Sequence, residues 1–387
     1  MNYKLSHPTN IVNCEINLPS SKSISNRLLI IKSICNNNFS IDNLSESDDT
    51  KILNKSLNSK EYLIDVNHAG TSFRFLTAFL STQTDKEFIL TGSERMKQRP
   101  IKDLVNALRY LGAKIEYLEE ENFPPLKIKG TNLSGDYIEI NGSISSQFIS
   151  SLLLIAPCFE NGLTIKIKGR LVSKSYVQMT LRLMEEFGIN WIWENDKIFI
   201  KNQDYIVKKF RVESDWSAAT FWFQIAALSD KCNIRLNGLK INSIQGDNKV
   251  LDIFKSLGVN IEYDIDSFVL TKSQNITVQK SYNLLSNPDI YQSLKCTIFG
   301  LKKNTNFTGI SNLIYKESNR ILSTENELKK LHTTKEINTY NDHRMAMCFA
   351  PLCMKFGILQ INNVSVVCKS YPYFWNDLKK GGFKISS

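Results

Sequence analysis

The chain has 387 residues and a formal net charge of +10, with 42% hydrophobic and 22% charged residues. This length predicts two or three domains with ample material for buried cores, and the composition is typical of a globular protein. No apolar run reaches the length of a membrane span, and the first residues lack the apolar region of a signal peptide. We therefore expect a cytoplasmic protein that does not bind membranes.

The charge and the cysteines narrow the classes of function. A nucleic-acid-binding protein should carry a Lys/Arg-rich arm or a recognised motif, and the sequence has neither. Many basic residues instead stand singly beside Gly, Ser or Asn at turns that open apolar segments, which favours a compact anionic ligand. The eight cysteines show no CxxC spacing and the four histidines no ligand spacing, so we expect free thiols and no metal site.

The first informative element is a helix predicted over "ISNRLLIIKSI", residues 24–34, after a turn at Pro19 and serines that can cap it. Lys22 and Arg27 are then placed at the start of this helix. That end of a helix is the positive end of its dipole, where cations are disfavoured. An anionic ligand bound there would compensate both cations.

A helical pattern that ends in an apolar–Gly step and leads into a strand-like segment recurs along the chain. Clear copies lie at 104–118, 180–193 and 250–263, and weaker ones at 51–66, 325–337 and 373–385. Glycine suits the step because helices commonly end on a left-handed residue, although His332 takes its place in one weak copy. Six α/β units favour two domains of three units each.

Hydroxyl, glycine and basic residues open two further apolar helices. Residues 68–80 place Gly70 before a helix with Arg74 in its first turn. Backbone N–H groups at such an end suit a phosphate or carboxylate, although glycine beside hydroxyls is usually only a cap. Residues 141–157 place short donors at the mouth of an apolar helix, where they either cap it or bind ligand oxygens.

Residues 92–113 place Arg95, Lys97 and Arg99 on a loop, with Pro100 in the first turn of the next helix. A solvated basic loop is the simple alternative to an anion-binding loop, and for this segment taken alone it is the better interpretation.

Two C-terminal segments carry titratable groups. Lys316 and Arg320 are four residues apart and are expected on one helical face, where like charges repel unless an anion lies between them. Glu317 is either a salt-bridge partner or a proton-transfer group.

Asp342, His343 and Arg344 come just before another buried helix in residues 339–352. His343 either makes a structural hydrogen bond to Asp342 or takes part in catalysis, and the sequence leaves both open.

In order along nearly the whole chain, these segments resemble the 5-enolpyruvylshikimate-3-phosphate synthase family. The stretches that carry the resemblance are "SSKSISNR", "RMKQRPI", "SSQF", "LVSKSY", "TYNDHRMAM" and "KSYPYFWNDL". The resemblance implies an α/β fold of the enolpyruvyl transferase type, a two-domain inside-out α/β barrel with three βαβαββ repeats in each domain. Domain I would comprise residues 1–19 and 213–387, domain II residues 20–212, with the active site in the cleft between them.

The activity implied by the resemblance is transfer of the enolpyruvyl group of phosphoenolpyruvate to the 5-hydroxyl of shikimate 3-phosphate, with release of phosphate. The reaction would run through a tetrahedral adduct in the pathway to aromatic amino acids. The partners implied are these two small molecules, with no nucleic acid, no metal and no organic cofactor, and the protein is expected to be a monomer.

The resemblance also assigns roles by motif. Shikimate 3-phosphate would contact residues of both expected domains, namely Lys22, Ser23, Arg27, Ser145, Ser146, Gln147, Ser173, Tyr176, Asp289, Asn312 and Lys316. Phosphoenolpyruvate would contact a largely cationic set, namely Lys22, Gly70, Arg99, Gln147, Arg320, Arg344 and Lys369. Asp289 would take the proton of the attacking hydroxyl, and Glu317, together with Lys22, would protonate the methylene carbon.

The chain departs from the family pattern at a few points. His68 stands where many relatives have Asn, Asn319 replaces the usual acidic residue before Arg320, and Ser286 with Asn287 replaces more usual residues before Pro288. None of these changes removes a residue expected to be catalytic.

Two other functions were weighed. The related enolpyruvyl transferase that acts on UDP-N-acetylglucosamine commonly carries a loop cysteine, which "ERMKQRP" lacks. A non-catalytic anion-binding or nucleic-acid-binding protein of the same fold would not need Asp289 and Glu317 beside its anions.

Overall fold

The computed structural model describes residues 1–36 and 39–387. The chain forms two compact units, which we name the terminal unit (Met1–Ser21 with Glu213–Ser387) and the middle unit (Lys22–Val212). The first crossing therefore follows Ser21 and not residue 19. In the terminal unit the backbone N–H of Ser21 donates to the carbonyl oxygen of Glu213 at 2.9 Å, so the two ends of this unit meet where the chain leaves it.

The described part of the middle unit is built on three inner helices that contact one another, α1 (Lys22–Ile34), α3 (Gly70–Ser81) and α6 (Ser146–Ile155). Its other helices are α2 (Asp48–Asn58), α4 (Glu94–Lys97), α5 (Lys102–Tyr110), η1 (Ala156–Cys158) and α7 (Lys174–Glu186). One four-stranded sheet has the order β4 (Leu63–Asp65), β5 (Glu87–Thr91), β7 (Leu126–Lys129), β6 (Lys114–Tyr117). A second has the order β10 (Trp191–Glu194), β11 (Lys197–Ile200), β9 (Leu163–Lys168), β8 (Asp136–Asn141), and β12 (Phe210–Arg211) pairs with β3 (Ile41–Asp42).

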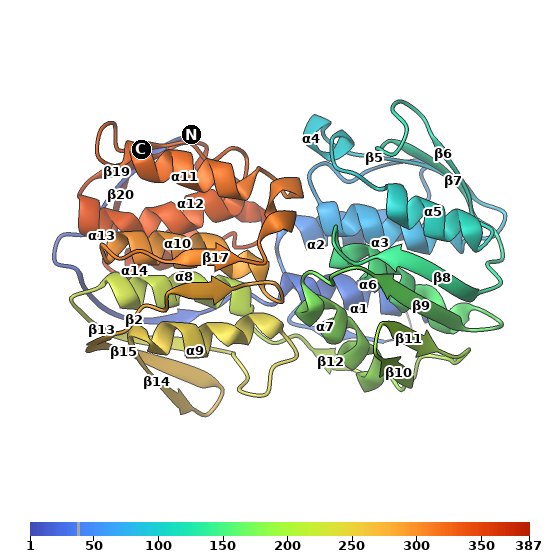
Figure 1. Cartoon of the computed structure of the whole chain (residues 1–387), viewed down its shortest axis with the longest axis horizontal. Coiled ribbons are helices and arrows are strands. Elements are labelled where there is room, and N and C mark those ends of the chain that lie inside the picture. Colours follow the sequence, from blue (N-terminus) through green and yellow to red (C-terminus); the bar gives the residue numbers. More distant parts are fainter. Residues whose placement is uncertain (37–38) are drawn as a thin grey trace. The chain divides into compact units, whose positions relative to one another are not determined.

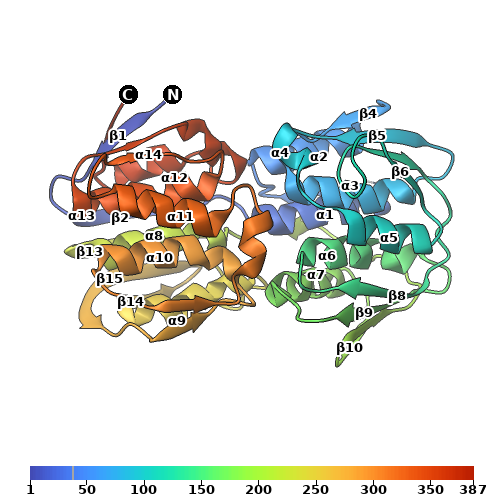
Figure 2. The same ribbon diagram turned by 45° about the horizontal axis from the view of Figure 1, so that its top comes forward.

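The terminal unit repeats this plan around α8 (Trp216–Leu228), α10 (Tyr291–Gly300) and α12 (His343–Phe349), which also contact one another (Figure 1). The other α-helices are α9 (Val250–Lys255), α11 (Arg320–Lys330), α13 (Cys353–Phe356) and α14 (Phe374–Lys380). The 3-10 helices are η2 (Gly246–Lys249), η3 (Pro288–Ile290), η4 (Ser311–Tyr315), η5 (Ala350–Leu352) and η6 (Val364–Lys369). Figure 2 shows α10, α11 and α12 side by side within this unit.

The sheets of the terminal unit match those of the middle unit in number of strands. One has the order β14 (Leu257–Asp264), β15 (Ser267–Ile276), β13 (Lys231–Asn237), β2 (Ile11–Asn17). The other four-stranded sheet has the order β18 (Glu336–Ile337), β19 (Leu359–Ile361), β1 (Tyr3–Ser6), β20 (Lys384–Ser386), and β16 (Ser281–Asn283) pairs with β17 (Asn306–Thr308).

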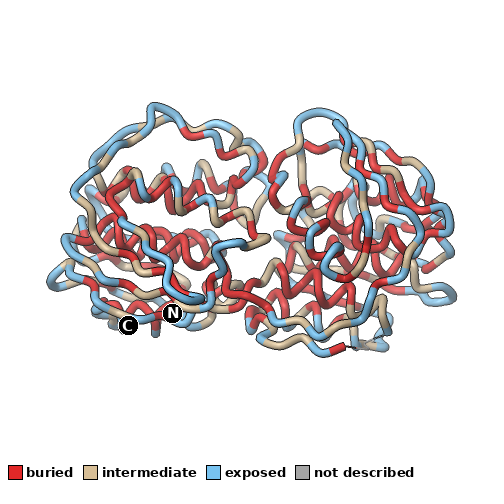
Figure 3. The backbone as a smooth tube through the Cα atoms, turned by 90° about the horizontal axis from the view of Figure 1, so that it is seen from below, coloured by how far each residue is buried: buried red, intermediate tan, exposed pale blue. Residues whose placement is uncertain are grey.

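The composition of the inner helices explains their position. In α8, Trp216 and Trp222 are fully buried, and apolar residues cover every side of the helix. A helix that is apolar all round is stable only when neighbours surround it. Figure 3 shows the same distribution in each unit, with the inner helices buried and the connecting loops exposed.

The predicted repeat of a helix, a turn and a strand is confirmed in all six copies. The pairs are α2 with β4, α5 with β6, α7 with β10, α9 with β14, α11 with β18, and α14 with β20. Gly112 and Gly188 follow their helices with φ of 102° and 81°, values that glycine adopts without steric cost. In the copy that has His332, the positive φ of 54° falls on Lys335 instead.

The prediction for the basic segment before α5 is wrong in two details. Arg95 and Lys97 lie in the short helix α4 and not on a loop, because the Ser93 side chain accepts a hydrogen bond from the Met96 N–H and caps this turn. Helix α5 begins at Lys102, so Pro100 precedes it.

Within the residues that the structure describes, no helix combines the length and apolarity that crossing a bilayer requires. All eight cysteines lie in the described ranges, and none forms a disulfide.

Candidate functional site

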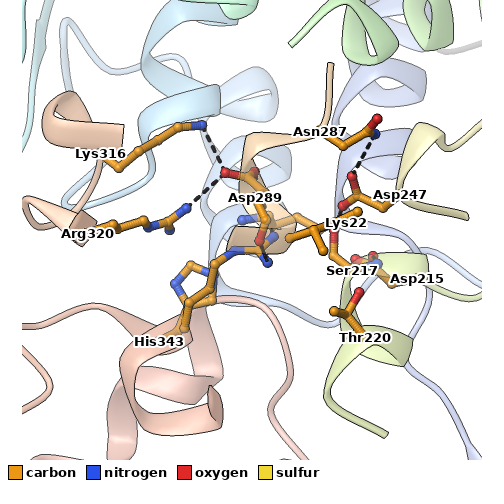
Figure 4. Close-up of polar contacts among 12 residues, drawn as sticks. Lys22, Asp215, Ser217, Thr220, Asp247, Asn287, Asp289, Lys316, Arg320 and His343 are labelled. Carbon is orange, nitrogen blue, oxygen red and sulfur yellow. Dashed lines mark hydrogen bonds and ion pairs between the residues drawn. The ribbon is translucent and has the colours of Figure 1, made fainter. Parts of the chain in front are cut away.

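In the terminal unit, Asp289 lies among three cations that come from three different segments. Two of them, Lys316 and Arg320, are seen beside it in Figure 4. It belongs to η3, the turn before α10. Its Oδ1 lies 3.0 Å from Arg320 Nη1 and 3.3 Å from Lys316 Nζ, and its Oδ2 lies 3.7 Å from Arg344 Nη2. Arg344 Nη1 also donates to the backbone oxygen of Asp289 at 2.8 Å.

This surrounding charge decides the protonation state of Asp289. Burial raises the pKa of the Asp289 carboxyl group. Lys316, Arg344 and Arg320 together lower the pKa by more than burial raises it, so it lies well below its usual range. At neutral pH the group is therefore an ionised hydrogen-bond acceptor, in the state that a proton acceptor requires.

Arg320 is the first residue of α11 and is 2% exposed. Besides Asp289, it contacts Glu317, whose Oε2 lies 2.7 Å from Nη2, and Asp342, whose Oδ2 lies 2.8 Å from Nε. Burial lowers the pKa of Arg320, but Asp342, Glu317 and Asp289 raise it above its usual range. A cation at the positive end of a helix is thus stabilised here by three carboxylates of the same unit.

The expected geometry of Lys316 is wrong. Lys316 has extended backbone angles after η4, and α11 starts only at Arg320, so the two residues do not share a helical face. Their side chains nevertheless meet at one anion, because both contact Oδ1 of Asp289. The compensating group between them is a carboxylate of the chain.

The remaining expected residues of this unit lie beside the same cluster. Lys369 Nζ lies 2.9 Å from Glu317 Oε1, and its side chain is 4% exposed. Asp342 caps α12 by accepting from the Arg344 N–H at 3.0 Å, and His343 Nδ1 lies 3.5 Å from the same carboxylate oxygen. Asn312, in η4, is buried. Four cations of this cluster therefore face the three carboxylates Asp289, Glu317 and Asp342.

In the middle unit, the N-terminal ends of the inner helices are joined by polar contacts. Lys22, the first residue of α1, donates from Nζ to Asp49 Oδ2 of α2 at 3.0 Å. Ser72 of α3 donates from Oγ to the backbone oxygen of Asp49 at 3.0 Å. Gln147 of α6 donates from Nε2 to Thr71 Oγ1 of α3, also at 3.0 Å. The starts of α1, α3 and α6 are thereby brought together.

The serines at the start of α6 lie as predicted, with Ser145 as the N-cap and Ser146 as the first helical residue. The Ser145 side chain accepts from the Gln147 N–H at 3.2 Å. The side-chain oxygen Oε1 of Gln147 is buried and has no hydrogen-bond partner within residues 1–36 and 39–387. A buried acceptor of this kind is suited to a donor on a bound molecule.

Arg27 lies deeper than predicted, in the second turn of α1, and is 2% exposed. It donates to Thr180 Oγ1 at 2.7 Å, to the backbone oxygen of Ser23 at 2.8 Å, and to Ser150 Oγ and the backbone oxygen of Tyr176 at 3.3 and 3.2 Å. Burial lowers the pKa of Arg27 to about 10, so the guanidinium is still charged at neutral pH. Arg27 therefore joins α1, α6 and α7.

Gly70 and Arg99 are in close contact at the start of α3. A Cβ atom at Gly70 would overlap the guanidinium group of Arg99, which is itself 6% exposed. Glycine leaves room here for the approach of Arg99, and its backbone angles do not call for glycine. Ser173, another expected residue, precedes α7 in a left-handed conformation with φ of 55°.

The structure groups the expected residues by unit, and nearly all lie at or close to the N-terminal end of a helix. Sequence reasoning missed Asp49, and among the carboxylates of the chain that compensate the cations at these ends it named only Glu317 as a possible salt-bridge partner. The acidic pair Asp48–Asp49 reads as ordinary first-turn acids of α2, which helix dipoles favour anyway. No local signal showed that Asp49 faces Lys22.

Comparison with known proteins identifies the family of the chain. The model of the family "EPSP synthase (3-phosphoshikimate 1-carboxyvinyltransferase)" matches residues 51–378. A 3-phosphoshikimate 1-carboxyvinyltransferase of Bacteroides fragilis strain YCH46 is 44% identical, with 100% of this chain and 99% of the relative covered. One of Aliivibrio fischeri strain ES114 is 34% identical, with 96% and 98% covered.

The solved structure of an EPSP synthase from Acinetobacter baumannii matches with a TM-score of 0.76 at 20% identity and covers 100% of both chains. This likeness confirms the expected fold class, the two-domain α/β fold of the enolpyruvyl transferases. With the family model matching most of its length and relatives this similar over their whole length, the chain belongs to the EPSP synthase family.

Proposed function

We propose that this protein transfers the enolpyruvyl group of phosphoenolpyruvate to the 5-hydroxyl of shikimate 3-phosphate and releases phosphate. Membership of the family supports this activity. The observation that carries it is the cluster around Asp289, in which ionised carboxylates lie within contact distance of several buried cations. Transfer of the enolpyruvyl group requires groups that accept and donate protons beside the cations, as Asp289 and Glu317 are, whereas binding an anion requires no proton transfer.

Phosphoenolpyruvate would bind through its phosphate and carboxylate groups to a mainly cationic set, namely Lys22, Gly70, Arg99, Gln147, Arg320, Arg344 and Lys369. Guanidinium groups suit both anions because they donate two parallel hydrogen bonds. Arg320 and Lys369 contact Glu317 at 2.7 and 2.9 Å. On binding, an anionic group of phosphoenolpyruvate would replace the Glu317 carboxylate as the partner of these two cations.

Shikimate 3-phosphate would be held by hydroxyl, amide and cationic groups, namely Lys22, Ser23, Arg27, Ser145, Ser146, Gln147, Ser173, Tyr176, Asp289, Asn312 and Lys316. Three of the serines stand at the N-terminal ends of α6 and α7, where backbone N–H groups favour phosphate.

In the proposed addition step, the 5-hydroxyl oxygen attacks C2 of phosphoenolpyruvate and its proton passes to Asp289. Glu317, assisted by Lys22, gives a proton to C3, which becomes a methyl group in a tetrahedral adduct. In the elimination step the C2–phosphate bond breaks and the methyl group loses a proton to Glu317, so the enol is restored and phosphate leaves.

The contacts of Glu317 suggest how it becomes an acid. With Arg320 and Lys369 as partners the carboxylate form is stabilised. When phosphoenolpyruvate takes both cations, Glu317 loses that stabilisation and gains proton affinity. Substrate binding itself would thus prepare the proton donor, while Asp289 retains Lys316 as a partner.

The decisive experiment measures phosphate release by the purified protein. Release only in the presence of both phosphoenolpyruvate and shikimate 3-phosphate supports the proposal. Release with UDP-N-acetylglucosamine in place of shikimate 3-phosphate would overturn it. Lys22→Ala should abolish nearly all turnover with the far-UV circular dichroism spectrum unchanged, and wild-type rates would refute the role of Lys22.

The monomeric state and the cytoplasmic location remain predictions. Light scattering coupled to size exclusion and cell fractionation would test them.

A further inference from the structure

Asp49 is a buried carboxylate that lies between two groups able to carry positive charge. Its side chain is 2% exposed, in the first turn of α2. One oxygen, Oδ2, accepts from Lys22 Nζ at 3.0 Å, and the other, Oδ1, lies 3.9 Å from Nε2 of His68. Oδ1 has no hydrogen-bond partner among the residues described.

The three groups come from three elements that pack together. Lys22 begins α1, Asp49 lies in α2, and His68 stands two residues before α3. The hydrogen bond from Ser72 Oγ to the backbone oxygen of Asp49 fixes α2 against α3. The backbone of Asp49 is therefore held between α2 and α3 independently of the ion pairs that its carboxylate makes.

The other charged side chains of this region have partners elsewhere. Arg74 of α3 donates to the backbone oxygens of Gly70 and Pro100 and contacts the sulfur of Met96. Arg99 lies against Gly70. Next to Asp49 along the chain, Glu46, which precedes α2, is exposed, and Asp48, the first residue of α2, is half-buried. Lys22 and His68 are thus the titratable groups in ion-pair contact with Asp49 in the described structure.

We propose that Asp49 is a positioning residue for Lys22 and that His68 regulates this pair through its own protonation. The proposal rests on the proposed function, in which Lys22 contacts both substrates. The ammonium group of Lys22 stands at the positive end of α1, and Asp49 compensates that unfavourable position and fixes the direction of Nζ.

The role of His68 follows from the second oxygen of Asp49. When His68 is protonated, it attracts Oδ1 of Asp49. The negative charge of Asp49 then interacts with two cations, so the attraction between Asp49 and Lys22 is weaker. Lys22 is then freer to contact an anionic substrate.

The structural coupling is tested without any substrate. NMR titration of the His68 imidazole in the whole protein, assigned by its loss in His68→Asn, should give a pKa that falls by about half a unit or more in Asp49→Asn. Asp48→Asn, one residue away in the same turn, is the matched control and should leave that pKa unchanged. An unchanged value in Asp49→Asn would overturn the proposal.

The effect on Lys22 is tested by phosphate release at saturating substrates. Asp49→Asn should lower kcat by about tenfold or more because Lys22 loses its fixed direction, whereas Asp48→Asn should stay within about twofold of the wild type. If Asp49→Asn does not fold, Asp49→Glu replaces it, and its retained carboxylate should keep most of the activity. Wild-type kcat in a folded Asp49→Asn variant would contradict the positioning role.

The regulation by His68 is tested by comparing KM for phosphoenolpyruvate in the wild type and in His68→Asn between about pH 5.5 and about pH 8, which brackets a histidine pKa of about 6.5. Dividing the KM of the wild type by the KM of His68→Asn at each pH removes the effect of substrate titration, because both proteins bind the same forms of the substrate. The relative KM of the wild type should fall about threefold on the acid side. A constant ratio would refute regulation by His68.

The ratio of KM between Asp49→Asn and the double variant Asp49→Asn with His68→Asn should not vary with pH, because the carboxylate that couples His68 to Lys22 is gone. Failure of the proposed function gives a different result, since the wild type would then release no phosphate although the NMR coupling persists.

Discussion

Arg320 and Asp342 form a buried ion pair in the terminal unit. Arg320 Nε donates to Asp342 Oδ2 at 2.8 Å, and the two side chains are 3% and 0% exposed. The same carboxylate accepts from the backbone N–H of Arg344 at 3.0 Å. One buried aspartate therefore orients two arginines that we expect to bind phosphoenolpyruvate.

Asp342→Ala should lower the free energy of unfolding by about 3–5 kcal/mol, because removing one partner leaves buried positive charge with less compensation. Equilibrium unfolding in urea measures this change. The matched control is Asp252→Ala, whose carboxylate pairs with Lys249 at the surface and should cost less than about 0.5 kcal/mol. Equal losses in the two variants would show that the buried pair contributes little.

The ionised Asp289 should make the stability of the protein depend on acid. Its pKa in the folded state lies below the unfolded value of about 3.9, so its contribution is complete above that pH and is lost as the pH falls toward the folded-state pKa. Asp289→Asn should therefore be less stable than the wild type at pH 7 by about 1–3 kcal/mol. Urea unfolding at a series of pH values should show this difference shrinking below about pH 4. A difference that stays constant would contradict the ionised state of Asp289.

Much of this site could be predicted from local patterns, and its charge pairing could not. The helices that start at Lys22, Gly70 and Ser146 follow from apolar runs that lie within a few positions, and Ser145 also caps the last of them. The pairing of Arg320 with Asp289 and Asp342 joins residues 31 and 22 positions apart, which only the packing of η3, α11 and α12 establishes.

The error at Lys316 has a local origin. The spacing of Lys316 and Arg320 suggested one helix, but Asn319 caps α11 by accepting from the Leu322 N–H and starts the helix one residue later. The substitution Asn319, noted as a departure from the family, is therefore a helix cap here.

Gly70→Ala should raise KM for phosphoenolpyruvate with little change in stability. The added methyl group overlaps the Arg99 guanidinium, which is the flexible end of a side chain and can move away. The loss of stability should thus stay below about 1 kcal/mol, while Arg99 is displaced from its position beside the helix end. Steady-state kinetics and thermal unfolding of the same preparation test this. A large loss of stability with unchanged KM would mean that Arg99 cannot move and does not bind the substrate.

Arg27→Lys tests whether a buried guanidinium that joins three helices also serves the substrate. A lysine keeps the charge but has one donor group, so it cannot reproduce the bonds to Thr180, Ser150 and the backbone oxygens of Ser23 and Tyr176. The expected cost is about 1–3 kcal/mol of unfolding free energy, because buried acceptors lose their donor.

The matched control for this variant is Arg109→Lys in the same unit, where Nε and Nη2 both donate to the backbone oxygen of Ile115, away from the expected site. Both variants should unfold at lower urea concentration than the wild type. Only Arg27→Lys should also raise KM for shikimate 3-phosphate, since its charge then stands at a different place relative to the serines of α6 and α7. If the two variants lose stability alike and both keep the wild-type KM, Arg27 holds the three helices together and does not bind the substrate.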